Sequence, residues 1–143
     1  MNNDVVGVVG VAFIKEGKML VVQSHRSKRA GNYFTFVGGG IEEGETPVEA
    51  ACREVAEEIG FDFTIETDEL EHVLTFRESA TSDPNLQIEM SVFVAHKEID
   101  VPLIPNDEIL EYRWYQLNDR KTKVSSSIKD HFVPYAIENV LLY

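Results

Sequence analysis

Hydrophobic residues in the first part of the chain are grouped in short blocks that are separated by polar turns. The apolar block Val5–Ile14 predicts a strand buried on both faces, because its hydrophobic residues do not alternate with polar ones. A second block, Met19–Gln23, follows after the turn Lys15–Lys18. Two strands joined by such a short turn are expected to form a β-hairpin.

The blocks that follow predict further strands. A polar, basic loop is expected over Ser24–Asn32, and then a short aromatic strand over Tyr33–Val37, which Gly38–Gly40 should end. Later strands are predicted at Glu71–Glu78, Leu86–Lys97 and Glu111–Leu117, with a turn-rich segment, Ser79–Asn85, between the first two. No repeat or linker interrupts this series, so residues 1–143 are expected to form a single domain.

Residues 46–60 carry the clearest helix signal in the chain. Thr46 and Glu49 have the spacing of a capping box, and Pro47 between them suits the first helical position. Gly60 is a natural stop for the helix. The apolar residues of this segment recur at helical spacing and form one stripe: Val48, Ala51, Cys52, Val55 and Ile59.

A final helix is predicted to start at Pro134 and to direct Ile137, Val140 and Leu141 toward the core. Strands that are interrupted by one strong helix and followed by another indicate an α+β fold, in the form of an α/β/α sandwich.

The composition is that of a soluble globular domain, with 43% hydrophobic and 27% charged residues in a chain of 143. The longest apolar run, Val5–Ile14, is too short to cross a bilayer. Met1–Asp4 lacks the basic start of a secretory signal, and the single cysteine, Cys52, cannot form an internal disulfide. A cytoplasmic protein without a membrane partner is therefore expected.

The negative charge is concentrated in one segment. The chain has a net charge of −12, and residues 42–71 alone contain twelve acidic residues against one basic residue, Arg53. Such an acidic surface argues against sequence-independent binding of long nucleic acids, which depends on basic patches. The local acidity is compatible with a divalent-cation site and equally with a solvated acidic helix.

Three glutamates of the predicted helix are candidates for metal binding. Glu54, Glu57 and Glu58 have i, i+3 and i+4 spacing, so they are expected on one face, where they repel one another. A hard cation such as Mg²⁺ or Mn²⁺ would relieve that repulsion. Gly38–Gly40 favours this interpretation over an ordinary acidic face, because a glycine loop lets backbone groups approach a metal or a phosphate closely.

Residues 39–61, GGIEEGETPVEAACREVAEEIGF, resemble a complete Nudix box. Phe61 departs from the aliphatic residue usual at the last position, and Val37 replaces the usual proline before the box. The resemblance implies the Nudix fold, a mixed β-sheet between helices with the box as a loop–helix–loop. The match is carried by Gly39, Glu45, Arg53, Glu54, Val55, Glu57, Glu58 and Gly60.

The resemblance also implies the activity of a Nudix hydrolase. Such a Mg²⁺-dependent pyrophosphohydrolase, for which Mn²⁺ is an alternative ion, cleaves a pyrophosphate bond in a nucleoside diphosphate linked to a group X. Glu54, Glu57 and Glu58 would be metal ligands, together with the Gly38 carbonyl. Glu57 and Arg53 would be catalytic residues. An ion pair between Arg53 and Glu45 would fix the loop against the helix. Gly39 would contact substrate, and Gly60 would have a structural role.

In the family, a carboxylate from the loop before the last strand often completes the site. Asp107, Glu108 and Glu111 are available there, and Glu108 best matches the family's spacing to Trp114. Ordinary surface acids in a polar loop are the alternative. The general base is therefore Glu108, Glu111 or Glu57, with Glu108 preferred.

Basic residues just before the glycines are candidates for substrate binding. Arg26 and Arg29 belong to the only basic cluster of the chain and could contact the terminal phosphate or the group X, although a solvated loop would have the same composition.

The substrate class is less defined than the chemistry. A nucleoside triphosphate, as in mutator-type enzymes, is the default, because the chain is small and residues 74–80 lack the proline or tyrosine of some other subfamilies. A Nudix-fold nucleotide-binding or regulatory module without turnover is the main alternative, although such modules typically lose box glutamates. A non-enzymatic cation-binding domain is a third. By resemblance, a small nucleotide partner and a homodimer are expected.

Overall fold

The computed structural model of the protein describes residues 5–80 and 83–143. In chain order its elements are β1 (Val5–Ala12), β2 (Ile14–Lys15), β3 (Lys18–Ser24), α1 (His25–Gly31), β4 (Val37–Gly40), α2 (Pro47–Ile59), the 3₁₀-helix η1 (Thr67–Glu69), β5 (Leu70–Ala80), β6 (Asp83–Ala95), β7 (Ile109–Tyr115), the π-helix η2 (Ser127–Phe132) and α3 (Val133–Glu138).

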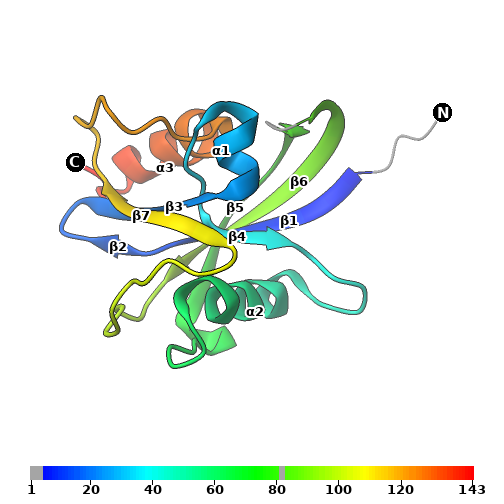
Figure 1. Cartoon of the computed structure of the whole chain (residues 1–143), viewed down its shortest axis with the longest axis horizontal. Coiled ribbons are helices and arrows are strands. Elements are labelled where there is room, and N and C mark those ends of the chain that lie inside the picture. Colours follow the sequence, from blue (N-terminus) through cyan, green and yellow to red (C-terminus); the bar gives the residue numbers. More distant parts are fainter. Residues whose placement is uncertain (1–4, 81–82) are drawn as a thin grey trace.

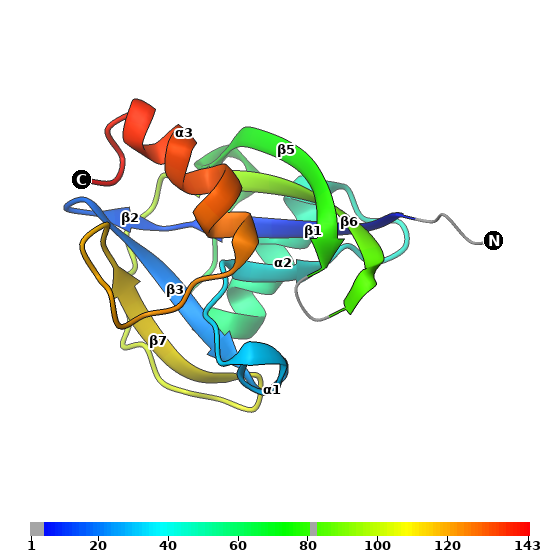
Figure 2. The same cartoon turned by 90° about the horizontal axis from the view of Figure 1, so that it is seen from above.

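The described strands form two sheets that lie between helices (Figure 1). One sheet has the order β4-β1-β6-β5, in which β1 is parallel to β6 and antiparallel to β4, and the other has the order β2-β3-β7. Figure 2 shows α3 in front of the strands and α2 behind them. The predicted mixed sheet between helices is therefore confirmed.

Each face of the strands has its own hydrophobic core. Leu20 and Val22 of β3 pack with Val55 of α2, whereas Met19 and Val21 of the same strand belong to the core beneath η2 and α3. This alternation follows from the period of two in a β-strand, which sends successive side chains to opposite faces. A strand covered on both faces needs apolar residues throughout, as the sequence predicted for the first blocks.

Helix α2 forms where the sequence predicts it. The Thr46 side chain accepts a hydrogen bond from the Glu49 amide, and the Glu49 carboxylate accepts one from the Thr46 amide, so both halves of the capping box are present. Ala51, Val55 and Ile59 are buried at helical spacing. No helix within residues 5–80 and 83–143 is long and apolar enough to cross a membrane.

The predicted N-terminal hairpin is wrong in its extent. Of the predicted first strand, only the part in β2 pairs with β3, through Ile14 with Met19 and Lys15 with Lys18, while β1 belongs to the other sheet. The strand is interrupted at Phe13, whose buried ring packs edge-on against Phe63 at a centroid distance of 5.9 Å. Burial of this ring marks the point at which the chain passes from one sheet to the other.

The predicted loop Ser24–Asn32 is instead helix α1, flanked by a capping residue at each end. Ser24 and Ser27 cap it reciprocally, with Ser27 in the position where a capping box usually has Glu or Gln. Asn32 ends it in the left-handed conformation, with φ of 57°.

The glycines extend a strand rather than ending one. Strand β4 is Val37–Gly40, paired with β1. Of the expected strand Tyr33–Val37, Val37 begins β4, and Phe34 and Thr35 make isolated bridges. A Cβ on Gly38 would lie 2.0 Å from the Val9 carbonyl oxygen, so only glycine allows the two strands to approach this closely.

The later strands occur as predicted, but their bounds differ by one to three residues. Strands β5 and β6 extend into the predicted turn Ser79–Asn85 as far as the pair Ala80 and Asp83. The two residues between that pair lie outside the described part of the chain.

The orientation predicted for the last helix is wrong. Ile137 and Val140 are 52% and 70% exposed, whereas Phe132, Ala136 and Leu142 are buried. The π-helical turn η2 precedes α3 and shifts the phase of the helix, which ends before Val140. Leu141 is half-buried against the core, in line with the prediction.

Candidate active site

Arg53 joins helix α2 to the loop in front of it. Its Nε and one terminal nitrogen donate to the two Glu45 carboxylate oxygens at 2.7 and 2.9 Å, and that terminal nitrogen also donates to the Gly40 carbonyl at 2.9 Å. The other terminal nitrogen lies 3.1 Å from Glu54 and 3.3 Å from Glu57. The pKa of Glu45 is lowered, chiefly by the hydrogen bond from Arg53. The ion pair expected between the loop and the helix is therefore present.

Three carboxylates converge beside this ion pair. One oxygen each from Glu54, Glu57 and Glu108 lies within 4.8 Å of the others. Glu54 is buried, and that burial raises the pKa of its carboxyl even though Arg53 is adjacent. A Cβ on Gly39 would lie 2.5 Å from the Glu54 carboxylate, so the glycine leaves room for that group.

Glu58 is turned toward the glycine strand instead of joining this group of three. Its carboxylate accepts a hydrogen bond from the Gly38 amide at 2.9 Å. Burial raises the pKa of Glu58 well above its usual value, and the neighbouring Glu54 and Glu108 charges add to that effect. The structure therefore gives Glu58 a contact with the glycine strand that the sequence did not predict.

Asn106 holds Glu108 at the cluster. Its side-chain oxygen accepts from the amides of Glu108 and Ile109, both at 2.9 Å, and its side-chain nitrogen donates to the Glu58 carbonyl at 3.2 Å. The Tyr112 hydroxyl donates to the same carbonyl. Sequence reasoning missed both residues, although an asparagine two positions before a candidate acid is a recognisable turn signal.

Glu111 lies away from the cluster. Strand alternation places it on the face opposite Tyr112, where its carboxylate pairs with Arg113. Of the acids considered in this loop and strand, the structure brings Glu108 to the box glutamates and directs Glu111 elsewhere.

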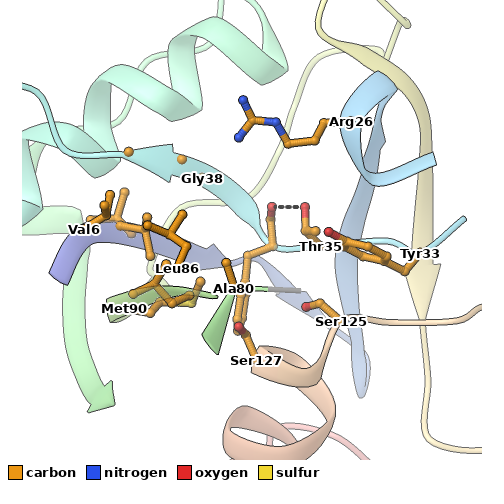
Figure 3. Close-up of a pocket in the computed structure, with 16 residues that line it drawn as sticks. Val6, Arg26, Tyr33, Thr35, Gly38, Ala80, Leu86, Met90, Ser125 and Ser127 are labelled. Carbon is orange, nitrogen blue, oxygen red and sulfur yellow. Dashed lines mark hydrogen bonds between the residues drawn. The ribbon is translucent and has the colours of Figure 1, made fainter. Parts of the chain in front are cut away.

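A pocket of about 290 Å³ lies along the glycine strand (Figure 3). Arg26 reaches over it from α1, and Gly38–Gly40 form part of its wall. Its apolar side comes from β1 and β6 and includes Val6, Leu86 and Met90. Arg29, the other predicted substrate contact, is exposed on α1 and does not line this pocket.

A family model described as the NUDIX domain matches residues 3–135. The chain belongs to the Nudix family. The resemblance of residues 39–61 is thereby confirmed, and the loop–helix–loop of the box is the segment that carries Glu45, Arg53 and the helix glutamates.

Relatives of this Nudix chain have several stated activities. An 8-oxo-dGTP diphosphatase from Proteus vulgaris is 38% identical over 55 residues, which are 38% of this chain and 49% of that protein. An RNA pyrophosphohydrolase from Gluconobacter oxydans is 45% identical over 53 residues, 36% of this chain and 30% of that protein. The chain thus aligns with half or less of the length of these curated relatives.

Solved structures match over nearly the whole chain. The MutT protein from Methanosarcina mazei has a TM-score of 0.77 at 19% identity, and the match covers 97% of this chain and 98% of that one. A MutT Nudix hydrolase from Burkholderia pseudomallei has a TM-score of 0.70 at 22% identity, with 96% and 99% covered. At these identities the likeness establishes the Nudix fold.

The carboxylate cluster of this Nudix chain fits a divalent cation. Oxygen donors are the ligands that Mg²⁺ and Mn²⁺ prefer, and the buried Glu54 has an incompletely compensated charge. A metal-free protein therefore keeps carboxylates close together at a cost in stability.

We expect Glu54→Gln to raise the free energy of unfolding of the metal-free protein by about 1 kcal/mol. The folded-state pKa of Glu54 is raised, so its contribution to stability is present below the unfolded pKa and is lost as the pH rises through the folded pKa. The wild type should therefore lose more stability than Glu54→Gln when the pH is raised from the ordinary range of a glutamate pKa to neutral pH or above.

Urea unfolding in EDTA at both ends of this pH range measures this effect. Glu49→Gln is the matched control on the same helix. Because the capping hydrogen bonds lower the pKa of Glu49, its replacement should destabilise the protein. A less stable Glu54→Gln protein would show that the carboxylate supports the fold instead of a metal.

Proposed function

We propose that this chain is a metal-dependent pyrophosphohydrolase that acts on nucleoside diphosphate derivatives, with nucleoside triphosphates as the first candidates. The observation that carries the proposal is the convergence of Glu54, Glu57 and Glu108 at a glycine strand that also forms the wall of a partly apolar pocket. The 8-oxo-dGTP diphosphatase among the relatives supports a nucleoside triphosphate.

In this proposal, the residues divide the work between binding and proton transfer. Glu54 and Glu57 would hold Mg²⁺ or Mn²⁺ together with Glu108, and a bound ion would neutralise phosphate oxygens and lower the pKa of a water molecule. Glu108 is the candidate to accept the proton of the attacking water, because it lies in the loop opposite the helix glutamates. The hydrogen bond between Gly38 and Glu58 uses the Gly38 amide and one Glu58 oxygen, so the ligand roles of Glu58 and of the Gly38 carbonyl stay predictions beside this set.

The pocket would receive the nucleoside. Its apolar side suits a base, and the Arg26 guanidinium at its mouth suits a phosphate oxygen. Cytoplasmic location, expected from the composition and the amino terminus, and assembly as a homodimer, expected from the family resemblance, stay predictions.

A panel of substrates tests the proposed activity. Nucleoside triphosphates, 8-oxo-dGTP, 5′-triphosphate RNA, a UDP-sugar and ADP-ribose are incubated with the protein and Mg²⁺ or Mn²⁺, and the products are separated by ion exchange. Cleavage of a nucleoside triphosphate to the monophosphate and pyrophosphate is expected. Tight binding of a nucleotide with no product from any of them would contradict the proposal and indicate a regulatory module.

The Asn106 side chain should affect turnover through Glu108. We expect Asn106→Ala to lower kcat by about tenfold to a hundredfold with little change in KM, because the loop that presents Glu108 loses four hydrogen bonds. Asn106→Asp keeps the oxygen that accepts from the loop amides, so it should recover part of the loss. Equal kcat in Asn106→Ala and the wild type would show that the loop is positioned without this residue.

A further inference from the structure

A second cavity, of about 410 Å³, lies on the face of β3 and β7 that is turned away from α2. Tyr112 points toward α2, where it bonds to Glu58, so its neighbours along β7, Glu111 and Arg113, point to the opposite face. The sheet therefore separates this cavity from the carboxylate cluster. The charged side chains that line it are Lys28, Glu111, Arg113, Lys121 and Lys123.

The cavity concentrates positive charge in an acidic protein. It holds four of the 13 basic residues of a chain with 25 acidic ones, and Glu111 is the single acid among its lining residues. The segment 42–71, which carries most of the negative charge, contributes no residue to it. A local field that attracts anions is the expected result.

Two of the four cations are fixed by the protein. The Arg113 guanidinium lies 4.6 Å from the centre of the Phe34 ring and donates to the Thr122 hydroxyl at 3.1 Å. The Lys123 ammonium donates to the Gly31 carbonyl at 3.0 Å. At the base of the cavity, the buried Gln23 amide donates to Asn32 at 2.9 Å. These contacts hold the charges in place before any ligand arrives.

The other two cations have no partner among the described residues. Within residues 5–80 and 83–143, the ammonium groups of Lys28 and Lys121 form no ion pair and no hydrogen bond. The loop that carries Lys121 is held by Asp119, whose carboxylate accepts from the Lys121 and Thr122 amides at 2.8 and 2.9 Å. Both ammonium groups are therefore available to a ligand, on a supported backbone.

The chemistry of the cavity selects a phosphate chain. Several cations around a polar cavity suit a group with many anionic oxygens, and Arg113 adds its charge although its Nε pairs with Glu111 and one terminal nitrogen with Thr122. Arg113 covers one face of the Phe34 ring and the ring is buried, so it offers no free face on which a nucleobase could stack. We propose that this cavity binds the phosphate chain of a second ligand, a free oligophosphate or a nucleotide, independently of the carboxylate cluster.

Isothermal titration with tripolyphosphate tests the proposal. EDTA keeps the carboxylate cluster free of metal, and ~50 mM salt limits screening. The wild type should bind one tripolyphosphate, and Lys28→Ala/Lys121→Ala should bind it about tenfold or more weakly. Lys15→Ala/Lys129→Ala is the matched control, since it removes the same charge from exposed positions outside the cavity and should bind within about twofold of the wild type.

A variant that removes a negative charge from the cavity should change the affinity in the opposite direction. Glu111→Gln removes the acid of the cavity and should tighten binding severalfold. A parallel titration with ATP distinguishes a free oligophosphate from a nucleotide as the ligand. Equal affinity would assign recognition to the phosphate chain alone, and tighter binding of ATP that the lysine variant also weakens would identify a nucleotide as the ligand.

Two results would overturn the proposal. One is no binding of tripolyphosphate or ATP by the wild type at millimolar concentration, and the other is an equal loss of affinity in both double variants, which would reflect net charge alone. Because the titration contains no divalent metal and measures no turnover, its failure would leave the proposed hydrolysis unaffected.

Discussion

Glu57→Gln should lower turnover by about a thousandfold or more. The substitution keeps the length of the side chain and a carbonyl oxygen that can still accept from Arg53, which lies 3.3 Å from Glu57. It removes one negative charge from the three carboxylates that would hold the metal. The loss should therefore come from the chemistry, with helix α2 intact, and steady-state kinetics measures it.

A matched substitution controls for the loss of charge alone. Glu43 is exposed in the same box and forms no ion pair within the described residues, so Glu43→Gln should keep most of the activity. Stabilisation of the protein by Mn²⁺, read as a rise in melting temperature, should shrink in Glu57→Gln and persist in Glu43→Gln. Near-normal turnover in Glu57→Gln would refute its assignment as a ligand.

The second large effect is expected at Glu108. Glu108→Gln should lower kcat by about a hundredfold to ten-thousandfold with little change in KM, because a glutamine cannot accept the proton of the attacking water. The defect should ease at high pH, where hydroxide replaces an activated water. Rates measured over a range of pH for the wild type and this variant give both quantities.

Glu111→Gln provides the comparison within the same strand. Its carboxylate pairs with Arg113 on the opposite face, so kcat should stay within a few-fold of the wild type. A severe defect in Glu111→Gln with a mild one in Glu108→Gln would reverse the assignment. Mild defects in both variants would indicate that the general base lies in the Nudix box, with Glu57 as the next candidate.

Helix α2 could be predicted from the sequence because its signals are local. The Thr46 and Glu49 cap, the proline between them and Gly60 all lie within one segment, and the structure places the helix between these limits. The Arg53 and Glu45 contact was predicted from the resemblance of residues 39–61 to the Nudix box, which implies an ion pair between these two positions.

The contacts of Glu58 and Glu108 could not be predicted from helical spacing alone. Glu58 follows Glu57 directly, yet its carboxylate bonds to the Gly38 amide, because β4 passes under that side of the helix. Glu108 is fifty positions from it and still joins Glu54 and Glu57, through the loop that Asn106 fixes. Helical spacing gives the face of a residue within about one turn, and contacts between elements decide the rest.

The predictions made for the glycines and for the last helix were wrong for related reasons. Gly38–Gly40 was interpreted as a strand end, whereas the approach of β1 to within 2.0 Å of a hypothetical Gly38 Cβ requires glycine inside the strand. Ile137 was placed on the core side of a helix that starts at Pro134, whereas the helical segment starts earlier, at the π-helical turn Ser127–Phe132, and its buried residues include Phe132 and Ala136. Neither backbone feature leaves a periodic signal in the sequence.

Metal dependence of turnover tests the proposed function most directly. Protein stripped of metal with EDTA is dialysed, and hydrolysis of its best nucleotide substrate is measured as Mg²⁺ or Mn²⁺ is added back. If the Glu54, Glu57 and Glu108 cluster works as a metal centre, turnover should be absent without metal and should rise to a plateau as the ion saturates the site. Undiminished turnover in excess EDTA would contradict the proposed function.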